Sequence, residues 1–206
     1  MIGVIDYRAG NAAGVLYAME RLGIAAEAVH TAEELEKYQG LILSGMGSAD
    51  AAIISLESEE LLEALQRKVL MDKVPLLGIG TGMEILFEHS EEDDTPCLGW
   101  LPGEAFLLPK TERMPQIGYY EVKLLEKHPL FEGCKGTERY FFSGSSYIRS
   151  EDAQLVLGQS FYGTQSHAAV AWENILGIAF HAEKSGAAGL KVLQNFVKFA
   201  EGRQTR

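Results

Sequence analysis

Residues 75–87 hold the feature that most constrains the fold of this chain: an apolar run, a turn with glycine at every second position, and a second apolar run. This pattern predicts a buried strand, a tight turn and an amphipathic helix. Such a turn is typical of a nucleophile elbow, in which small flanking residues let the backbone bend sharply and raise one side chain above a parallel sheet. Gly78 and Gly82 are the flanking residues, and Gly80 is the tip. The sequence therefore predicts an elbow without a nucleophile.

Apolar segments of strand length alternate with segments of helical periodicity through the first half of the chain and again at its end. This alternation is the signature of a parallel sheet with covering helices. Besides the elbow, the expected strands are residues 1–6, 25–29, 40–43 and 174–180, and the expected helices are residues 59–70, residues 186–201 and two helices capped by Asn11 and Thr31.

Residues 99–171 have a different pattern, with short β-type runs separated by Gly, Pro and Ser. We expect these runs to form antiparallel strands at the edge of the sheet. The chain has no internal repeat, low-complexity segment or linker. The predicted fold is therefore α/β, a doubly wound, mostly parallel sheet with flanking helices and an antiparallel edge extension, in a single domain over residues 1–206.

Composition narrows the classes of function. The formal net charge of −11 argues against binding to nucleic acid or to an anionic membrane surface. No apolar run reaches the roughly 18 residues of a membrane span, and the start of the chain lacks the features of a signal peptide. Cys97 and Cys134 are far apart and belong to no Cys/His cluster, so no metal site or disulfide framework is indicated. We expect a cytoplasmic protein without a cofactor.

His181 and Glu183 follow the expected strand 174–180, at the edge of the sheet where reactive groups of doubly wound folds gather. A histidine with a carboxylate two residues later is suited to act as a general base with its orienting group. An isolated His-x-Glu is more often a capping histidine beside a solvated carboxylate. The elbow earlier in the chain favours the active-site interpretation.

Two further loops follow expected strands. Residues 44–47, which include Met46 and Gly47, can present backbone N–H groups to an oxyanion, although two glycines after a strand often form a plain turn. Residues 6–11 carry polar side chains that suit a partner contact and a helix cap equally well. The loop 143–146 is interpreted as a turn between edge strands.

These motifs, in this order, resemble the class I glutamine amidotransferases, and within them the glutaminase subunit of imidazole glycerol phosphate synthase from histidine biosynthesis. The resemblance runs nearly from end to end. Its most specific segments are Leu-Phe-Glu-His-Ser-Glu-Glu at 86–92, Leu-Gly-Trp-Leu-Pro-Gly at 98–103 and Phe-His-Ala-Glu-Lys-Ser at 180–185, and the segments 1–11 and 41–47 also match.

The resemblance implies roles for individual residues. In the family, a cysteine at the elbow attacks the side-chain amide of glutamine, a His-x-Glu pair activates it, and ammonia passes to a (β/α)8-barrel cyclase subunit. His181 and Glu183 match the activating pair, and Gly80 stands at the position of the cysteine. The oxyanion and substrate-binding positions fall on four residues: Met46, Gly47, Thr81 and Glu84.

The departures from the family pattern gather around the expected pocket and the partner face. Glu84 replaces a glutamine, Thr81 replaces a larger residue, and a histidine of the family is absent near Ser143. Arg8 stands where the family carries glycine, and Tyr119 replaces a tryptophan. The expected partner interface comprises Arg8, Asn11, Gln116, Tyr119 and Lys184.

The sequence therefore predicts a glutaminase-subunit-like protein that has lost its nucleophile and serves as a non-hydrolysing partner or regulatory subunit of a (β/α)8-barrel synthase. One alternative is an enzyme that uses His181 and Glu183 on a different substrate without a covalent intermediate. Another is an ordinary histidine-pathway subunit that carries engineered substitutions. A cysteine at position 80 in the natural gene would support the last alternative.

Overall fold

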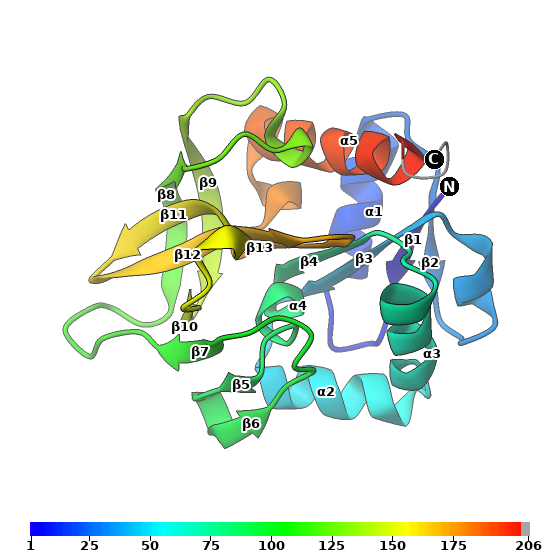
Figure 1. Cartoon of the computed structure of the whole chain (residues 1–206), viewed down its shortest axis with the longest axis horizontal. Helices are drawn as coiled ribbons and strands as arrows, with labels where there is room; N and C mark the ends of the chain where they lie inside the picture. Colours follow the sequence, from blue (N-terminus) through cyan, green and yellow to red (C-terminus); the bar gives the residue numbers. More distant parts are fainter. Residues whose placement is uncertain (203–206) are drawn as a thin grey trace.

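The computed structural model describes residues 1–202, and within them the strands form a nine-stranded sheet in the order β2-β1-β3-β4-β13-β12-β11-β8-β9 and a four-stranded sheet in the order β10-β7-β5-β6 (Figure 1). The strands are β1 (Ile2–Ile5), β2 (Ala26–Val29), β3 (Gly40–Gly45), β4 (Leu76–Gly80), β5 (His89–Ser90), β6 (Thr95–Pro96), β7 (Glu104–Leu107), β8 (Gln116–Leu124), β9 (Thr137–Gly144), β10 (Ser146–Arg149), β11 (Val156–Tyr162), β12 (Thr164–Trp172) and β13 (Ile175–Ile178). The α-helices are α1 (Ala12–Arg21), α2 (Ala49–Ser58), α3 (Leu62–Gln66), α4 (Thr81–Glu84) and α5 (Gly186–Gly202). Shorter helical segments are η1 (Glu34–Lys37), η2 (Arg67–Met71), η3 (Glu92–Asp94), η4 (Pro129–Phe131), η5 (Ala153–Leu155) and η6 (Ala182–Lys184).

The strands β2, β1, β3, β4 and β13 are neighbours in the large sheet and all run parallel. Helices α1 and α5 cover one face of this sheet, and α2 and α3 cover the other (Figure 1). Parallel strands bring their carboxyl ends to one edge, where ligands of doubly wound folds bind. The predicted doubly wound α/β fold is confirmed.

The sheet continues beyond β13 with the antiparallel strands β12, β11, β8 and β9. These strands form the antiparallel extension that the pattern of residues 99–171 predicts. The small sheet was not expected, and it lies on the same side of the large sheet as α2 (Figure 1). Its strands β7 and β10 pair in antiparallel register, which places Ser146 opposite Leu107.

Two hydrophobic clusters, one on each face of the large sheet, form the core. The first includes Val15 of α1 and Phe196 of α5, and the second includes Leu56 of α2 and Leu65 of α3; all four side chains are fully buried. This burial on both faces explains why the parallel strands are almost continuously apolar. Within residues 1–202, no helix combines the length and the hydrophobicity that crossing a membrane needs.

The helices in residues 49–71 differ from those that the sequence predicts. Helix α2 was not expected, because alanine supplies much of its buried face and the periodicity is weak; Ser48 caps it by accepting a hydrogen bond from the Ala51 N–H at 3.3 Å. The expected helix over residues 59–70 is wrong in its extent: α3 begins at Leu62 and passes into the π-helical η2. Glu60, with a φ of 57°, separates α2 from α3.

The elbow helix also differs from its prediction. Helix α4 is a single turn of four residues, Thr81–Glu84, and all of them are buried. The apolar run that follows it, up to Phe87, is fully buried as well. The segment is therefore enclosed on all sides, and the amphipathic helix expected here is wrong.

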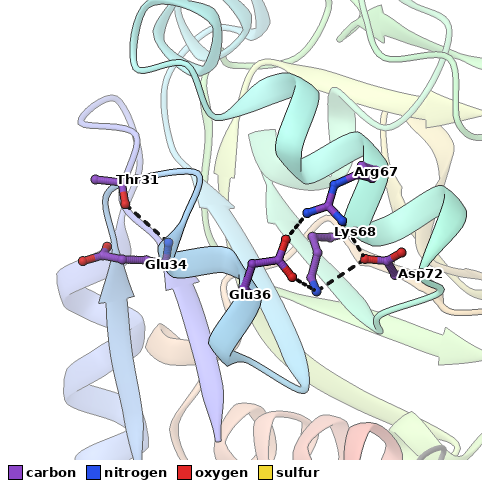
Figure 2. A network of polar contacts seen from close by, with 6 residues as sticks. All are labelled: Thr31, Glu34, Glu36, Arg67, Lys68 and Asp72. Atoms are coloured by element: carbon purple, nitrogen blue, oxygen red, sulfur yellow. Dashed lines mark hydrogen bonds and ion pairs between the residues drawn. The ribbon is translucent and has the colours of Figure 1, made fainter.

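Charged side chains join η1 to η2 (Figure 2). Lys68, which is 7% exposed, bridges Glu36 at 2.9 Å and Asp72 at 3.4 Å, and Arg67 contacts the same two carboxylates. Two basic and two acidic groups thus neutralise one another, which allows the Lys68 ammonium to lie inside the protein. Nearby, Thr31 accepts a hydrogen bond from the Glu34 N–H at 3.4 Å, but the N-cap residue of η1 is Glu33, so the predicted cap position is wrong by two residues.

Candidate functional site

The turn from β4 to α4 is as sharp as the glycine pattern predicts. Gly80 has a φ of 59° and a ψ of −123°, a conformation that strains residues with a β-carbon. Packing requires the flanking glycines: a β-carbon on Gly82 would overlap the Leu43 carbonyl, and one on Gly78 would lie 2.5 Å from the Gly82 carbonyl oxygen. The elbow backbone is therefore held tightly against β3.

The space beside the elbow tip is already occupied. A β-carbon on Gly80 would lie 2.6 Å from the Gly45 carbonyl oxygen and 2.8 Å from Cε1 of His181. Gly45 pairs with Gly80 across β3 and β4, and His181 follows β13, the other neighbour of β4. The sheet register thus brings the predicted base to the predicted elbow.

His181 and Glu183 form a buried pair, with side chains 0% and 1% exposed. His181 Nδ1 lies 3.0 Å from Glu183 Oε1, so an Nδ1–H donor leaves Nε2 as the acceptor of the neutral ring. Nε2 is buried without a hydrogen-bond partner. The ring is therefore oriented as a base needs, with Nε2 near the elbow tip.

Asn11 completes this group, and its expected role as a helix cap is wrong. It precedes α1, but its side chain makes no capping hydrogen bond. Its Nδ2 instead donates to Glu183 Oε1 at 2.6 Å. A buried carboxylate needs such donors, and this need outweighs the local preference of asparagine for the end of the helix.

The residues expected to stabilise an oxyanion lie together at the ends of β3 and β4. Thr81 Oγ1 donates to the Gly47 carbonyl oxygen at 2.6 Å, which links the loop after β3 to the elbow. Met46, which is 38% exposed, and Gly47 lie at the same cavity as Gly80 and Thr81. Because its hydroxyl already donates this hydrogen bond, Thr81 serves to link the two loops.

Glu84 lies at the wall of this cavity, which has a volume of about 320 Å³. It is 7% exposed and accepts hydrogen bonds from the Ser90 hydroxyl at 2.6 Å and the Ser146 hydroxyl at 2.7 Å. Burial raises the pKa of the Glu84 carboxyl above its ordinary value, and the two hydroxyl donors oppose that rise. The cavity thus contains an acidic group whose charge is poorly solvated.

The residues expected at the partner face do not all lie on the surface. Arg8 is exposed, and its Nε lies 3.0 Å from Glu59 Oε1. The Tyr119 hydroxyl donates to the Lys184 carbonyl oxygen at 2.7 Å, and Lys184 Nζ lies 5.8 Å from the centre of a phenylalanine ring, that of Phe141. Gln116, in contrast, is 6% exposed and lies at the cavity.

Sequence reasoning missed Ser90 and Ser146 as partners of Glu84. Ser90 lies on β5 of the small sheet, and Ser146 begins β10. Their convergence depends on the pairing of β5 and β10 with β7, which no local pattern encodes. The predicted turn at 143–146 is shorter than expected, because β9 ends at Gly144 and only Ser145 separates it from β10. The excess of serine at residues 143–146 was the one available signal.

The fold and the site together define an α/β protein of the amidotransferase type, with a strand-to-helix elbow facing a His-Glu pair. The chain belongs to the class I glutamine amidotransferase family, whose model matches residues 3–199. Residues 1–202 contain no cluster of three or more His, Cys, Asp or Glu side chains that could hold a metal ion.

The sequences of several relatives align with nearly the whole chain. It is 36% identical to the imidazole glycerol phosphate synthase subunit HisH of Dehalococcoides mccartyi over 98% of each chain. It is 37% identical to the HisH subunit of Methanocaldococcus jannaschii, over 96% of this chain and 99% of the relative. A crystal structure of a glutamine amidotransferase superposes with a TM-score of 0.77 at 20% identity, covering 97% of this chain and 98% of that one.

Proposed function

We propose that this chain is a HisH-type subunit that docks on a (β/α)8-barrel synthase subunit and does not hydrolyse glutamine. The observation that carries the proposal is Gly80: the residue at the elbow tip has no side chain, and the position of its absent β-carbon is crowded by Gly45 and His181. Thioester formation needs a nucleophile at this point, and removing the nucleophile from such a unit lowers the rate by several orders of magnitude.

Neither the two cysteines of the chain nor the Thr81 hydroxyl replaces a cysteine at the tip. Burial and the charge of Glu84 raise the pKa of the Cys97 thiol to about 12, and burial also raises the pKa of Cys134. Both thiols are therefore protonated and unreactive at neutral pH. The Thr81 hydroxyl donates to Gly47 and has no contact with His181 that would activate it.

The burial of the His181–Glu183 pair also favours a structural role for this pair over a new hydrolytic one. His181 is 0% exposed, and its Nε2 has no hydrogen-bond partner. A general base has to reach the proton that it removes, directly or through one water. Because His181 is enclosed behind the elbow, the use of this pair on another substrate is the less favoured function.

Docking on a barrel subunit is supported by the near end-to-end similarity to HisH chains. The residues at the expected interface differ from the family pattern, with the charged Arg8 at a glycine position and Tyr119 at a tryptophan position. We therefore propose that the chain either takes a barrel partner different from the standard histidine-pathway cyclase or binds that cyclase weakly.

The test combines two measurements. The purified chain is assayed for ammonia release from glutamine, alone and with the (β/α)8-barrel cyclase encoded in the same genome, and the two chains are co-expressed with a tag on one of them. We expect no ammonia above background and co-purification in a fixed ratio. Steady ammonia release at the rate of a HisH-containing synthase would refute the loss of glutaminase activity, and failure to co-purify with any barrel synthase of that genome would refute the docking.

A further inference from the structure

The antiparallel extension of the large sheet has one buried face and one exposed face. The buried face includes Val122, Tyr140 and Phe142, which belong to the same hydrophobic cluster as side chains of α1 and α5. The opposite face, called the outer face below, carries Ile117 and Tyr119 of β8, Arg139 and Phe141 of β9, and Phe161 of β11.

We propose that the outer face is part of the surface on which the (β/α)8-barrel subunit docks, and that this subunit meets it with an apolar patch bordered by carboxylates. The inference rests on the proposed function and adds to it the chemistry that the partner has to present.

The large hydrophobic side chains of the outer face are exposed and contiguous. Phe161 is 70% exposed, Ile117 60% and Tyr119 46%. Tyr119 and Phe161 line one groove of about 820 Å³, and the Tyr119 and Phe141 rings meet edge to face with their centroids 5.6 Å apart. The solvated face of an antiparallel sheet is normally polar, and contiguous exposed hydrophobic side chains mark interaction sites.

Contacts around this patch hold it in a fixed shape. Arg139 Nη2 donates to the Tyr119 carbonyl oxygen at 2.7 Å. On the hairpin that carries Phe161, the Tyr162 hydroxyl donates to the Arg113 carbonyl oxygen at 2.8 Å. A preorganised surface loses little conformational freedom when a partner covers it. The burial of Phe161 can therefore contribute to affinity without a large cost of ordering.

Basic groups outnumber acidic groups on the outer face, although the whole chain has a formal net charge of −11. Lys123 and Arg139 line the groove, and Glu121 is the one acidic side chain among the described residues that line it. Beside the groove, Lys184 Nζ lies 5.8 Å from the centre of the Phe141 ring. A local excess of positive charge on an acidic protein favours a partner that presents carboxylates there.

Arg139 has a suitable geometry for one of these carboxylates. The hydrogen bond from its Nη2 to the main chain orients the guanidinium plane, while the side chain stays exposed. A guanidinium has five N–H donors, so others remain for a ligand. An oriented guanidinium binds a carboxylate through two parallel hydrogen bonds, and arginine and aromatic residues are enriched in protein interfaces.

Position and charge both favour the barrel subunit as the occupant. The Tyr119 hydroxyl donates to the Lys184 carbonyl oxygen, so the outer face adjoins residues at which the barrel is expected to dock. A second copy of this chain, packed on the same face about a two-fold axis, would bring the basic groups of both copies together. Such like-charge contacts oppose association.

The test measures the affinity of the full chain for the (β/α)8-barrel subunit encoded in the same genome, by calorimetry at low and at high salt. Phe161→Ala should weaken binding at least about tenfold, since aromatic side chains buried within an interface are frequent hot spots. Trp172→Ala is the matched control. It removes another exposed aromatic side chain, on β12 and outside the groove, and should leave the affinity unchanged.

A second pair of variants tests the charge. Arg139→Gln should weaken binding and reduce the dependence of affinity on salt, whereas Arg139→Lys should keep that dependence because it keeps the charge. Arg21→Gln, which removes an exposed charge at the end of α1, should change neither quantity. A loss of affinity in Arg139→Gln with unaltered salt dependence would indicate a structural role for Arg139 and overturn the carboxylate assignment.

The outcomes separate this inference from the docking itself. Full affinity of both Phe161→Ala and Arg139→Gln for the barrel subunit would overturn the inference and leave the proposed docking intact. Absence of binding by the wild type would refute the docking and the inference with it. Sedimentation of the chain alone as a dimer that Phe161→Ala dissociates would assign the outer face to a second copy and overturn the barrel as its occupant.

Discussion

His181 Nε2 lies 3.0 Å from the position that a β-carbon on Gly80 would occupy. The imidazole therefore fills the space that a nucleophilic side chain at the elbow would need. A side chain at position 80 would require movement of the ring, of the Gly45 carbonyl or of the turn itself. In this chain, the tip of the elbow has neither a side chain nor room for one.

The first prediction concerns substitutions at the elbow tip. Gly80→Ala and Gly80→Cys should each lower the free energy of unfolding by more than the roughly 1–3 kcal/mol that an unfavourable φ alone costs, because the new β-carbon also overlaps Gly45 and His181. Gly80→Cys should produce little glutaminase activity, since the resemblance implies that Thr81 and Glu84 also depart from the family pattern. Urea denaturation and ammonia release measure the two effects.

Gly23→Ala is the matched control for this experiment. Gly23 has a φ of 67°, close to that of Gly80, but a β-carbon there would meet nothing within 4 Å. The difference between the two alanine variants reports the cost of the overlap together with the cost of the ψ of −123° at Gly80. Equal losses of stability in both variants would show that the elbow has room for a side chain.

The second prediction concerns the hydrogen bond from Asn11 to Glu183. Asn11→Ala should lower the free energy of unfolding by about 1–3 kcal/mol, because it removes a donor from a buried carboxylate. A double-mutant cycle with Glu183→Gln checks the pairing. Strictly additive losses in the double variant would mean that the two side chains do not depend on each other.

The third prediction is a dependence of stability on pH through Glu84. Burial raises the pKa of this carboxyl in the folded state. Its contribution is therefore fully present below the pKa of the unfolded chain, and it is lost as the pH rises through the folded-state pKa. Urea midpoints from about pH 5 to about pH 8 should fall in the wild type relative to Glu84→Gln, by at most about 1.4 kcal/mol per pH unit. A constant difference across this range would count against a raised pKa.

The fourth prediction concerns Arg8, a non-glycine residue with a φ of 65°. Its ion pair with Glu59 is exposed and contributes little, so Arg8→Gly should change the free energy of unfolding by less than about 1 kcal/mol, with relief of backbone strain offsetting the lost pair. The same change should tighten binding to an ordinary histidine-pathway cyclase. Surface plasmon resonance tests this, and tight binding by the wild type that Arg8→Gly leaves unaltered would contradict it.

Sequence patterns predict the large sheet well because parallel strands buried on both faces leave a strong apolar signal, as in Leu41–Leu43 and Leu76–Leu77. They predict helices less well where the buried face is small. The buried alanines of α2 are only weakly hydrophobic, so they give little helical periodicity in the sequence. The segment Thr81–Phe87 is buried on all sides, so it has no polar face that would show helical periodicity.

In the candidate site, too, some residues can be predicted from local sequence and others cannot. Gly78, Gly82, His181 and Glu183 are recognisable because their spacing along the chain is fixed by the turn and by the end of β13. The contacts of Asn11 with Glu183 and of Ser146 with Glu84 join residues 172 and 62 positions apart. Such pairings depend on how the strands and loops assemble, and a single sequence carries no record of them.

The register between β4 and β13 places Ile79 beside Ile178, just before Gly80 and His181, through main-chain hydrogen bonds alone. The spatial frame of the site therefore does not depend on which side chain stands at the elbow tip. Selection on binding can then act on the surrounding loops without first rebuilding the domain. The elbow is thus a property of the sheet, and the chemistry at its tip is a separate property of one residue.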